Sequence, residues 1–208
     1  AGGKSSRFGE DKSTVKLGNK TLLDHTVNKI ENEFNEILVI SNNKELNFKN
    51  KKIQVIEDCI EGQLGPLVGI LTAMKWVKEN KKNYRWVASF PCDTPFFDIN
   101  LTNKLKLKTN NTSKKLIFLN SEKKRHNIFG AWSIDLIEIL ENDLKKNFRK
   151  VEIWADKIGY ESININITPV PDAPYVNTIP DTTILEDDYF TYDLEAVDAD
   201  SDELNYSI

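Results

Sequence analysis

Residues 36–41 read Glu-Ile-Leu-Val-Ile-Ser, and this stretch decides the fold class. Its four central residues form a continuous apolar run, which is typical of a strand buried on both faces of a parallel sheet. Apolar residues at helical spacing come before it, at 22–30, and after it, from Gly65-Pro66 to Val77. Buried strands that alternate with amphipathic helices predict an α/β fold in which helices cover a sheet.

More elements of the same kind follow along the first 160 residues. Short apolar segments predict strands at 53–57, 86–90, 116–119 and 129–132, and helical spacing predicts a helix at 134–140. We therefore expect one α/β domain over residues 1–166, with functional loops after the carboxyl ends of its strands.

The net charge of −4 hides an uneven distribution of charged residues. Residues 1–166 carry 28 basic and 21 acidic residues, whereas residues 167–208 carry 11 acidic residues and no basic ones. A basic first part suits a polyanionic ligand such as a nucleotide, although its lysines are spread over ordinary surface positions. We expect a second, different part at 167–208, and neither nucleic acid nor a membrane as a partner, since no apolar run approaches a membrane span.

The cysteines and the chain ends bear on location and completeness. Cys59 and Cys92 form no Cys-x-x-Cys pair, so neither a disulfide framework nor a zinc site is indicated, and the first part is interpreted as cytoplasmic. The sequence has no initiator Met and ends at Tyr206-Ser207-Ile208 within an apparent strand, so we interpret it as a fragment at both ends.

The opening residues 1–12 read Ala-Gly-Gly-Lys-Ser-Ser-Arg-Phe-Gly-Glu-Asp-Lys. Gly2 and Gly3 allow the backbone to approach a triphosphate closely, and Lys4, Arg7 and Lys12 supply positive charge. The stretch predicts a phosphate-binding loop that lacks the Walker A spacing. Taken alone, it is equally compatible with a solvated terminus.

Two later motifs follow predicted strands. Asp58 comes after the strand at 53–57 and precedes Gly65-Pro66-Leu67-Val68-Gly69, which alone predicts only a helix start. Asp93 lies in Phe90-Pro91-Cys92-Asp93-Thr94-Pro95 after the strand at 86–90. A carboxylate there can hold Mg²⁺ on phosphate oxygens, while an isolated Asp-Thr-Pro is usually a turn.

These three motifs, in this order, resemble those of the molybdenum cofactor guanylyltransferases. The resemblance implies a three-layer, Rossmann-like nucleotidyltransferase sheet of the GT-A type that lacks its first strand, because in the family the opening loop follows a strand that is absent ahead of Ala1. It also implies transfer of GMP from GTP to molybdopterin with Mg²⁺, with release of pyrophosphate. Proteins of molybdenum cofactor biosynthesis and molybdoenzyme maturation are the implied partners.

The resemblance assigns roles to individual residues. Arg7, Lys12 and Asp93 are the implied catalytic residues, with Asp93 the Mg²⁺ ligand. The implied nucleotide-binding residues are Ala1, Gly2, Gly3, Lys12, Ser41, Asn42, Asp58, Gly65, Pro66, Leu67 and Asp93. Asn43 is an alternative to Asn42. The candidates for binding the acceptor substrate are Arg125, His126, Arg149, Asn164 and Asn166.

From residue 167 onward the sequence resembles bacterial cadherin-like or immunoglobulin-like surface repeats, which implies a partial β-sandwich repeat. Alternation from Tyr189 to Leu194 predicts a strand. Asp198, Asp200 and Asp202 alternate, so their carboxylates could bind Ca²⁺, although a solvated acidic turn is about as compatible with the pattern. Two alternatives remain for the whole chain: a sugar-phosphate or cytidylyl nucleotidyltransferase, and a calcium-binding adhesion fragment whose enzyme-like part is inactive.

Overall fold

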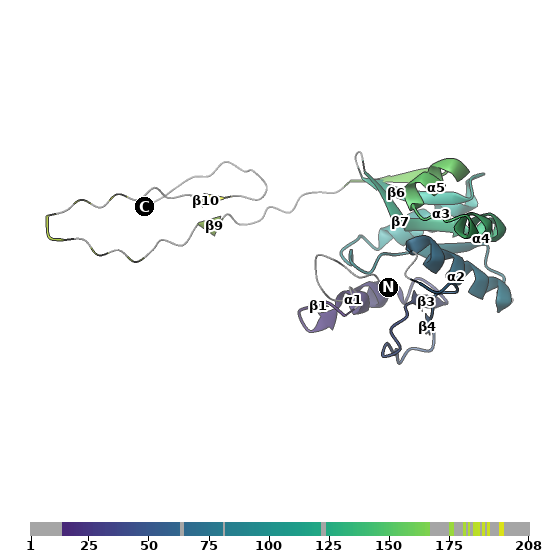
Figure 1. The fold of residues 1–208 in the computed structure, drawn as a ribbon, viewed down its shortest axis with the longest axis horizontal. Helices are drawn as coiled ribbons and strands as arrows, with labels where there is room; N and C mark the ends of the chain where they lie inside the picture. Colours follow the sequence, from purple (N-terminus) through teal and green to yellow (C-terminus); the bar gives the residue numbers. More distant parts are fainter. Residues whose placement is uncertain are drawn as a thin grey trace. The chain divides into compact units, whose positions relative to one another are not determined.

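The computed structural model describes residues 14–62, 65–80, 82–121 and 124–166, together with scattered positions between 175 and 197 (Figure 1). The chain consists of two compact units, residues 1–165 and 166–208. In the described residues, no helix has the length and hydropathy needed to cross a membrane.

The first half of unit one begins with a short hairpin and continues with one helix and two strands. Thr21 caps the helix by a reciprocal pair of hydrogen bonds, because its Oγ1 accepts the Asp24 N–H (3.0 Å) and the Asp24 carboxylate accepts the Thr21 N–H (3.1 Å). The elements are β1 (Lys16–Leu17), β2 (Lys20–Thr21), α1 (Leu22–Ile30), β3 (Ile37–Ile40) and β4 (Ile53–Ile56).

The second half supplies most of the sheet. Its elements are α2 (Pro66–Glu79), β5 (Trp86–Ser89), α3 (Asn100–Asn110), β6 (Leu116–Ser121), β7 (Lys124–Ser133), the 3₁₀ turn η1 (Ile134–Leu136), α4 (Ile137–Lys145), α5 (Val151–Ile158) and β8 (Glu161–Ile165). A β-bulge between Phe118 and Leu119 interrupts the pairing of β6 with β7.

The strands pair in two groups. β3 and β4 are parallel, with Ile37 opposite Ile53, and the other group has the order β5-β7-β6-β8. β7 is antiparallel to both β5 and β6, and β8 is parallel to β6, so β5, β6 and β8 run in one direction. Because α2 returns the chain from the end of β4 to the start of β5, β3 and β4 share that direction. The carboxyl ends of all five strands therefore face one edge.

Two apolar clusters lie on opposite faces of the strands, which gives three layers. One cluster combines α2, α4 and α5 with the sheet and contains the fully buried Trp132 and Trp154. The other combines α1 and α3 with the sheet and contains Val27, Leu105 and Ile117. Alternate strand residues supply the two clusters, which is the consequence of a sheet covered on both sides.

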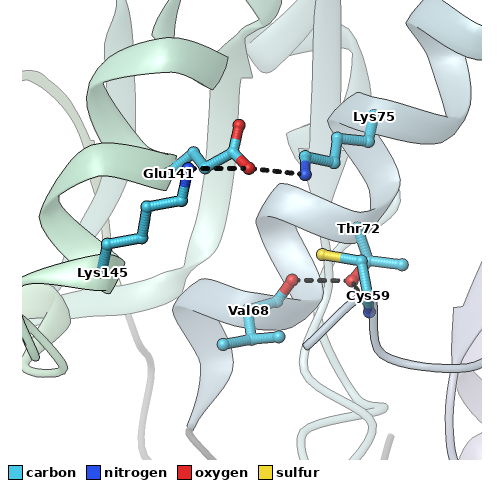
Figure 2. Close-up of polar contacts among 6 residues, drawn as sticks. All are labelled: Cys59, Val68, Thr72, Lys75, Glu141 and Lys145. Atoms are coloured by element: carbon cyan, nitrogen blue, oxygen red, sulfur yellow. Dashed lines mark hydrogen bonds and ion pairs between the residues drawn. The ribbon is translucent and has the colours of Figure 1, made fainter. Parts of the chain in front are cut away.

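Helix α2 is tied to its neighbours by polar contacts (Figure 2). Lys75 on α2 donates to the Glu141 carboxylate on α4 at 2.9 Å, and Lys145 lies 3.6 Å from the same oxygen. The hydrogen bond to Glu141 is the main cause that raises the pKa of Lys75, while Lys75 in turn lowers the pKa of Glu141. The pair fixes the contact between two helices on the same face of the sheet.

The structure confirms every predicted strand and helix of the first 160 residues and adds β1, β2, α3, α5 and β8, which the apolar pattern did not predict. Only scattered residues of the predicted second part, 167–208, are described. β9 (Tyr175–Val176) pairs antiparallel with β10 (Ala196–Val197), and this short pair does not show a β-sandwich. The strand predicted at 189–194 falls mostly outside the described residues, and Tyr189 and Thr191 have no regular structure.

Candidate active site

The loops that follow β3, β4 and β5 bring the predicted nucleotide-binding residues to one edge of the sheet. A cavity of about 1380 Å³ that extends between the helices along β3 and β5 reaches this edge, where Ser41, Asn42, Asn43, Asp58, Gly65, Pro66, Gly69 and Cys92 line it. Residues from three separate stretches of sequence thus meet at one cavity, which is the arrangement expected of a ligand site in an open α/β sheet.

Two hydrogen bonds join Asn42, in the loop after β3, to Asp58, in the loop after β4. The Asn42 Nδ2 donates to Asp58 Oδ2 at 3.2 Å, and the Asp58 backbone N–H donates to Asn42 Oδ1 at 3.1 Å. Asn43 does not join them, since its Oδ1 accepts the Glu45 N–H in a local turn. The structure therefore favours Asn42 over Asn43 as the amide that acts with Asp58.

Ser41 has a different position from the one that its predicted role suggests. Its side chain is buried, and its Oγ accepts the Asn43 N–H at 3.2 Å. The hydroxyl therefore shapes the turn after β3 and directs Asn42 toward Asp58. A direct contact between Ser41 and a nucleotide stays a prediction.

The N-terminus of α2 lies beside this pair. Gly65 caps the helix with φ 87° and ψ 179°, a conformation that a side chain would strain, and no side chain bonds to the exposed helix end. Unpaired N–H groups and the helix dipole make such an end favourable for a phosphate. The Cys59 N–H donates to Thr72 Oγ1 at 2.9 Å, which holds the loop carrying Asp58 against the helix (Figure 2).

Two residues of the Gly-Pro-Leu-x-Gly motif need correction. Leu67 was predicted to bind nucleotide, but its side chain is fully buried in the apolar core, so only its backbone could contact a ligand. Gly69 was left out of the predicted site, yet a Cβ there would lie 3.9 Å from Asp58 Oδ1 and 3.6 Å from an Ile40 methyl group. Its position one helical turn after Gly65 is the signal that could have identified it.

Asp93 lies in the loop after β5, and its side chain is exposed. Aromatic packing anchors this loop on either side, because the rings of Phe90 and Phe97 lie 5.4 Å apart and Phe97 meets Phe129 at 4.9 Å. Lys29 on α1 also donates to the Pro95 carbonyl at 3.4 Å. The loop thus has a fixed base at the same edge as Asn42 and Asp58.

The sequence of this chain is similar to those of known nucleotidyltransferases. Residues 1–155 match the family model described as the MobA-like NTP transferase domain. The chain belongs to this family. A molybdenum cofactor guanylyltransferase of Haemophilus influenzae is 31% identical over 164 residues, which are 78% of this chain and 83% of that protein. One from Nitrobacter hamburgensis is 27% identical over 183 residues, 87% of this chain and 88% of that protein.

Solved structures have the same fold as this MobA-like domain. Molybdopterin-guanine dinucleotide biosynthesis protein A of Archaeoglobus fulgidus matches with a TM-score of 0.63 at 16% identity, over 78% of this chain and 80% of that one. A 2-C-methyl-D-erythritol 4-phosphate cytidylyltransferase of Francisella tularensis matches with a TM-score of 0.54 at 19% identity, over 76% and 84%.

A second polar group of the MobA-like domain lies where β6 and β8 end and β7 begins. Asn120 donates to Asn164 Oδ1 at 3.3 Å across the parallel pair, and Ser121 Oγ lies 2.6 Å from His126 Nε2. Burial, and secondarily Lys124, lowers the pKa of His126, which favours the neutral imidazole. Asn164 and His126 are thus at the functional edge. Asn166 follows β8 with its side chain exposed.

Arg125 and Arg149 are already engaged in structural contacts. The Arg125 guanidinium donates to Asp156 at 2.7 Å and lies 4.4 Å from the Tyr160 ring centroid, so it joins β7 to α5. The Arg149 guanidinium donates to the Leu144 carbonyl at 2.7 Å and caps the end of α4. These partners favour a positioning role for both, and their contact with an acceptor substrate stays a prediction.

Several predicted residues lie outside the described part of the chain. They are Ala1, Gly2, Gly3, Arg7 and Lys12 of the opening loop, and Asp198, Asp200 and Asp202 of the tail. Among the residues that are described, no group of three or more His, Cys, Asp or Glu side chains could hold a metal ion. A Mg²⁺ site at Asp93 would therefore depend on phosphate oxygens and water for its other ligands, which is the usual way in which Mg²⁺ binds at nucleotide sites.

Proposed function

We propose that this chain is a molybdenum cofactor guanylyltransferase, which transfers GMP from GTP to molybdopterin and releases pyrophosphate. The observation that carries the proposal is the meeting of Asn42, Asp58 and the N-terminus of α2 at one cavity, with the Asp93 loop at the same edge. Membership of the MobA-like family and the relatives' activity support it.

In this mechanism the protein positions the two substrates and stabilises charge. Asp58, held by Asn42, binds the nucleoside end of GTP, and the N–H groups at the start of α2 receive its phosphates. The molybdopterin phosphate attacks the α-phosphorus of GTP, the bond to the β,γ-diphosphate breaks, and pyrophosphate leaves. No covalent intermediate with the protein forms, so placement and electrostatics account for most of the catalysis.

Three residues would stabilise the negative charge at the reacting phosphates. Lys12 and Arg7 supply positive charge from the opening loop, as the family resemblance implies, and Asp93 holds Mg²⁺. Mg²⁺ bound there would supply positive charge to offset the negative charge that develops as pyrophosphate leaves. Asn164 and His126, which lie at the functional edge and bond to Asn120 and Ser121, would contact the pterin of the acceptor. We expect the reaction to take place in the cytoplasm, with molybdoenzyme-maturation proteins as partners.

Replacement of Asp93 tests this assignment. Asp93→Asn keeps the size and the turn-forming ability of the side chain but removes its charge, so turnover should fall roughly a hundredfold or more while the fold is retained. The measurement is pyrophosphate release from GTP with molybdopterin at varied Mg²⁺, with circular dichroism to report folding. Asp98→Asn is the matched control, because Asp98 accepts the backbone N–H (2.9 Å) and the side-chain Nδ2 (3.4 Å) of Asn100 in a local turn, and asparagine can still accept the shorter bond. Equal turnover of the two folded variants would contradict the role of Asp93.

A nucleotidyltransferase for another acceptor is the second candidate, since the cytidylyltransferase of Francisella tularensis has the same fold. The substrates that the chain uses distinguish these two candidate functions. We expect pyrophosphate release with GTP to exceed that with CTP or UTP, and molybdopterin to be preferred over sugar phosphates. A cadherin-like, Ca²⁺-binding tail also stays a proposal, which titration calorimetry with Ca²⁺ on the Asp198, Asp200 and Asp202 alanine variants can decide.

A further inference from the structure

Ser121 and His126 form a hydrogen-bonded pair at the functional edge of the sheet. Ser121 is the last residue of β6, His126 lies near the start of β7, and Ser121 Oγ is 2.6 Å from His126 Nε2. The strand register explains the contact. His126 is opposite Leu119 on β6, and Ser121, two residues further along, points to the same face as Leu119. The pairing of β6 with β7 therefore holds both side chains on one face, and we call them the serine–histidine pair.

The loop that carries Asp93 is anchored on this same face. Leu119 and Phe129 belong to the apolar cluster that α1 and α3 cover. The Phe90 ring lies 5.1 Å from the Phe129 ring, and the Phe97 ring lies 4.9 Å from it, so both ends of the Asp93 loop pack against β7. The serine–histidine pair thus shares a face and an edge of the sheet with the loop to which the reacting phosphates are assigned.

Burial decides which atom of the pair donates the hydrogen. Ser121 is 6% exposed, so water has little access to its hydroxyl group. Among the described residues, His126 Nε2 is the one hydrogen-bond partner of Ser121 Oγ. Because a buried hydroxyl proton needs an acceptor, Ser121 donates to Nε2. A neutral imidazole that accepts at Nε2 carries its own proton on Nδ1.

The surroundings of His126 agree with this tautomer. Burial lowers the pKa of His126, and the positive charge of Lys124 lowers it further, so the neutral ring that the hydrogen bond requires is favoured. In the described part of the chain, Nδ1 has no hydrogen-bond partner, although the residue is half-buried. The ring therefore offers one directed N–H donor at the functional edge.

We propose that Ser121 is a positioning residue for the acceptor substrate, which holds His126 so that its Nδ1–H donates to a carbonyl oxygen of the acceptor's ring system. The inference rests on the proposed function and deepens it. The pyrimidine ring of a pterin carries such an oxygen, and an uncharged donor suits an uncharged carbonyl. The opposite tautomer would present a lone pair to the same oxygen and lose the bond, so the hydroxyl of Ser121 contributes to substrate selection.

Nuclear magnetic resonance of the ring nitrogens tests the tautomer without any substrate. The chain has two histidines, so labelling of histidine with ¹⁵N gives two sets of ring signals, which His126→Gln assigns. His25 is an internal control, because its Nε2 lies 3.0 Å from the Leu17 carbonyl oxygen, which can only accept. At about pH 8, where both rings are neutral, we expect the proton on Nε2 in His25 and on Nδ1 in His126.

Variants of Ser121 show whether the hydroxyl sets this tautomer. Ser121→Ala should move the proton of His126 toward Nε2, whereas Ser121→Thr, which keeps a hydroxyl, should leave it on Nδ1. Molybdopterin added to the unaltered chain should shift the Nδ1 signal of His126. A proton on Nε2 in both histidines, or an unchanged tautomer in Ser121→Ala, would overturn the proposal.

Steady-state kinetics test the link to the acceptor. Ser121→Ala should raise the KM for molybdopterin about tenfold, as expected for one lost hydrogen bond, while the KM for GTP stays within about threefold. Ser133→Ala is the matched control, because Ser133 is also 6% exposed and lies on β7, but its Oγ accepts the Asp135 N–H at the opposite edge. It should leave both KM values within about threefold.

The outcomes separate this inference from the proposed function. An unchanged KM for molybdopterin in folded Ser121→Ala, or an equal rise in Ser133→Ala, would overturn the positioning role while transfer by the unaltered chain continues. Absence of transfer by the unaltered chain would instead reject the proposed function and, with it, the contact to the acceptor. The nitrogen spectrum would still decide the tautomer of His126 in that case.

Discussion

At the scale of single residues, the pair of Asn42 and Asp58 explains how two loops form one binding surface. Each end of the Asn42 amide bonds to Asp58, once to its carboxylate and once to its backbone N–H. Asp58 Oδ1 is on the side of Gly69 and α2, where a ligand at the helix end would meet it. The sequence could place both residues after strands, but it could not decide between Asn42 and Asn43, because adjacent residues in a turn have no fixed direction until the turn forms.

This choice can be tested with a pair of alanine variants. Asn42→Ala removes the partner of the Asp58 carboxylate, so GTP should bind about tenfold more weakly, as expected for one hydrogen bond to a charged group. Asn43→Ala removes only a turn contact to Glu45, and GTP affinity should stay within about threefold. Titration calorimetry gives both values. A larger loss of GTP affinity for Asn43→Ala than for Asn42→Ala would show that Asn43, and not Asn42, supports nucleotide binding.

At the scale of elements, the predictions succeeded where apolar residues recur at clear spacing and failed where other contacts decide the structure. β3 and α2 were predicted because their apolar residues are consecutive or helically spaced. α3 was missed because only Leu101, Thr102 and Leu105 of its eleven residues are buried. α5 was not predicted, because its buried residues, Val151, Trp154 and Ala155, span only a short segment. Tertiary packing, not local propensity, makes these helices.

Strand β7 contains a glycine that packing requires. A Cβ at Gly130 would lie 2.0 Å from the Ile117 carbonyl oxygen on β6, beside the β-bulge, so Gly130→Ala should destabilise the domain by about 1–3 kcal/mol or more. Gly69→Ala is the control, since its Cβ would make ordinary contacts within a helix and should be neutral or stabilising by up to about 1 kcal/mol. Urea unfolding measures both. Equal stability of the two variants would contradict the close approach of β6 and β7.

Helices α4 and α5 are joined through a buried carboxylate. Asp143 accepts from Lys157 Nζ at 2.7 Å and from Trp154 Nε1 at 2.9 Å. Burial acts to raise the pKa of Asp143, but the hydrogen bonds from Lys157 and Trp154, together with the charge of Lys157, outweigh it and lower the pKa. A lowered pKa in the folded state stabilises the protein above the unfolded pKa, near 4, and this contribution is lost as the pH falls through the folded value.

Asp143→Asn should therefore cost about 1–3 kcal/mol at neutral pH, and the difference from the unaltered chain should shrink as the pH falls below about 4. Asp135→Asn, at an exposed ion pair 3.7 Å from Lys115, is the control and should cost less than about 1 kcal/mol at any pH. Urea unfolding as a function of pH gives both curves. A cost at Asp143 that does not depend on pH would contradict an ionised carboxylate at this position.

At the scale of the whole molecule, the sequence predicted two parts from their charge, and the structure also divides into two compact units, between residues 165 and 166. The opening loop and the tail aspartates lie outside the described residues, so their roles still rest on sequence resemblance. What the sequence could not indicate was the order in which the described strands pair, because pairing leaves no mark in the periodicity of a single strand.

Removal of the tail tests whether the two parts are independent. Deletion of residues 170–208 should leave GTP affinity within a few fold, because the binding residues assigned here all precede the deletion and the acidic segment gives a phosphate no favourable charge. The unfolding midpoint of the first unit should also stay unchanged within error. A large loss of GTP affinity in the shortened chain would show that the tail takes part in nucleotide binding.

The transfer reaction itself tests the central claim most directly. GTP labelled at the α-phosphate is incubated with molybdopterin, Mg²⁺ and the 208-residue chain. The account predicts that the label appears in a guanylylated pterin in step with pyrophosphate release, and that α-labelled CTP gives much less product. Label that remains in GTP, or that enters the pterin more readily from CTP, would contradict it.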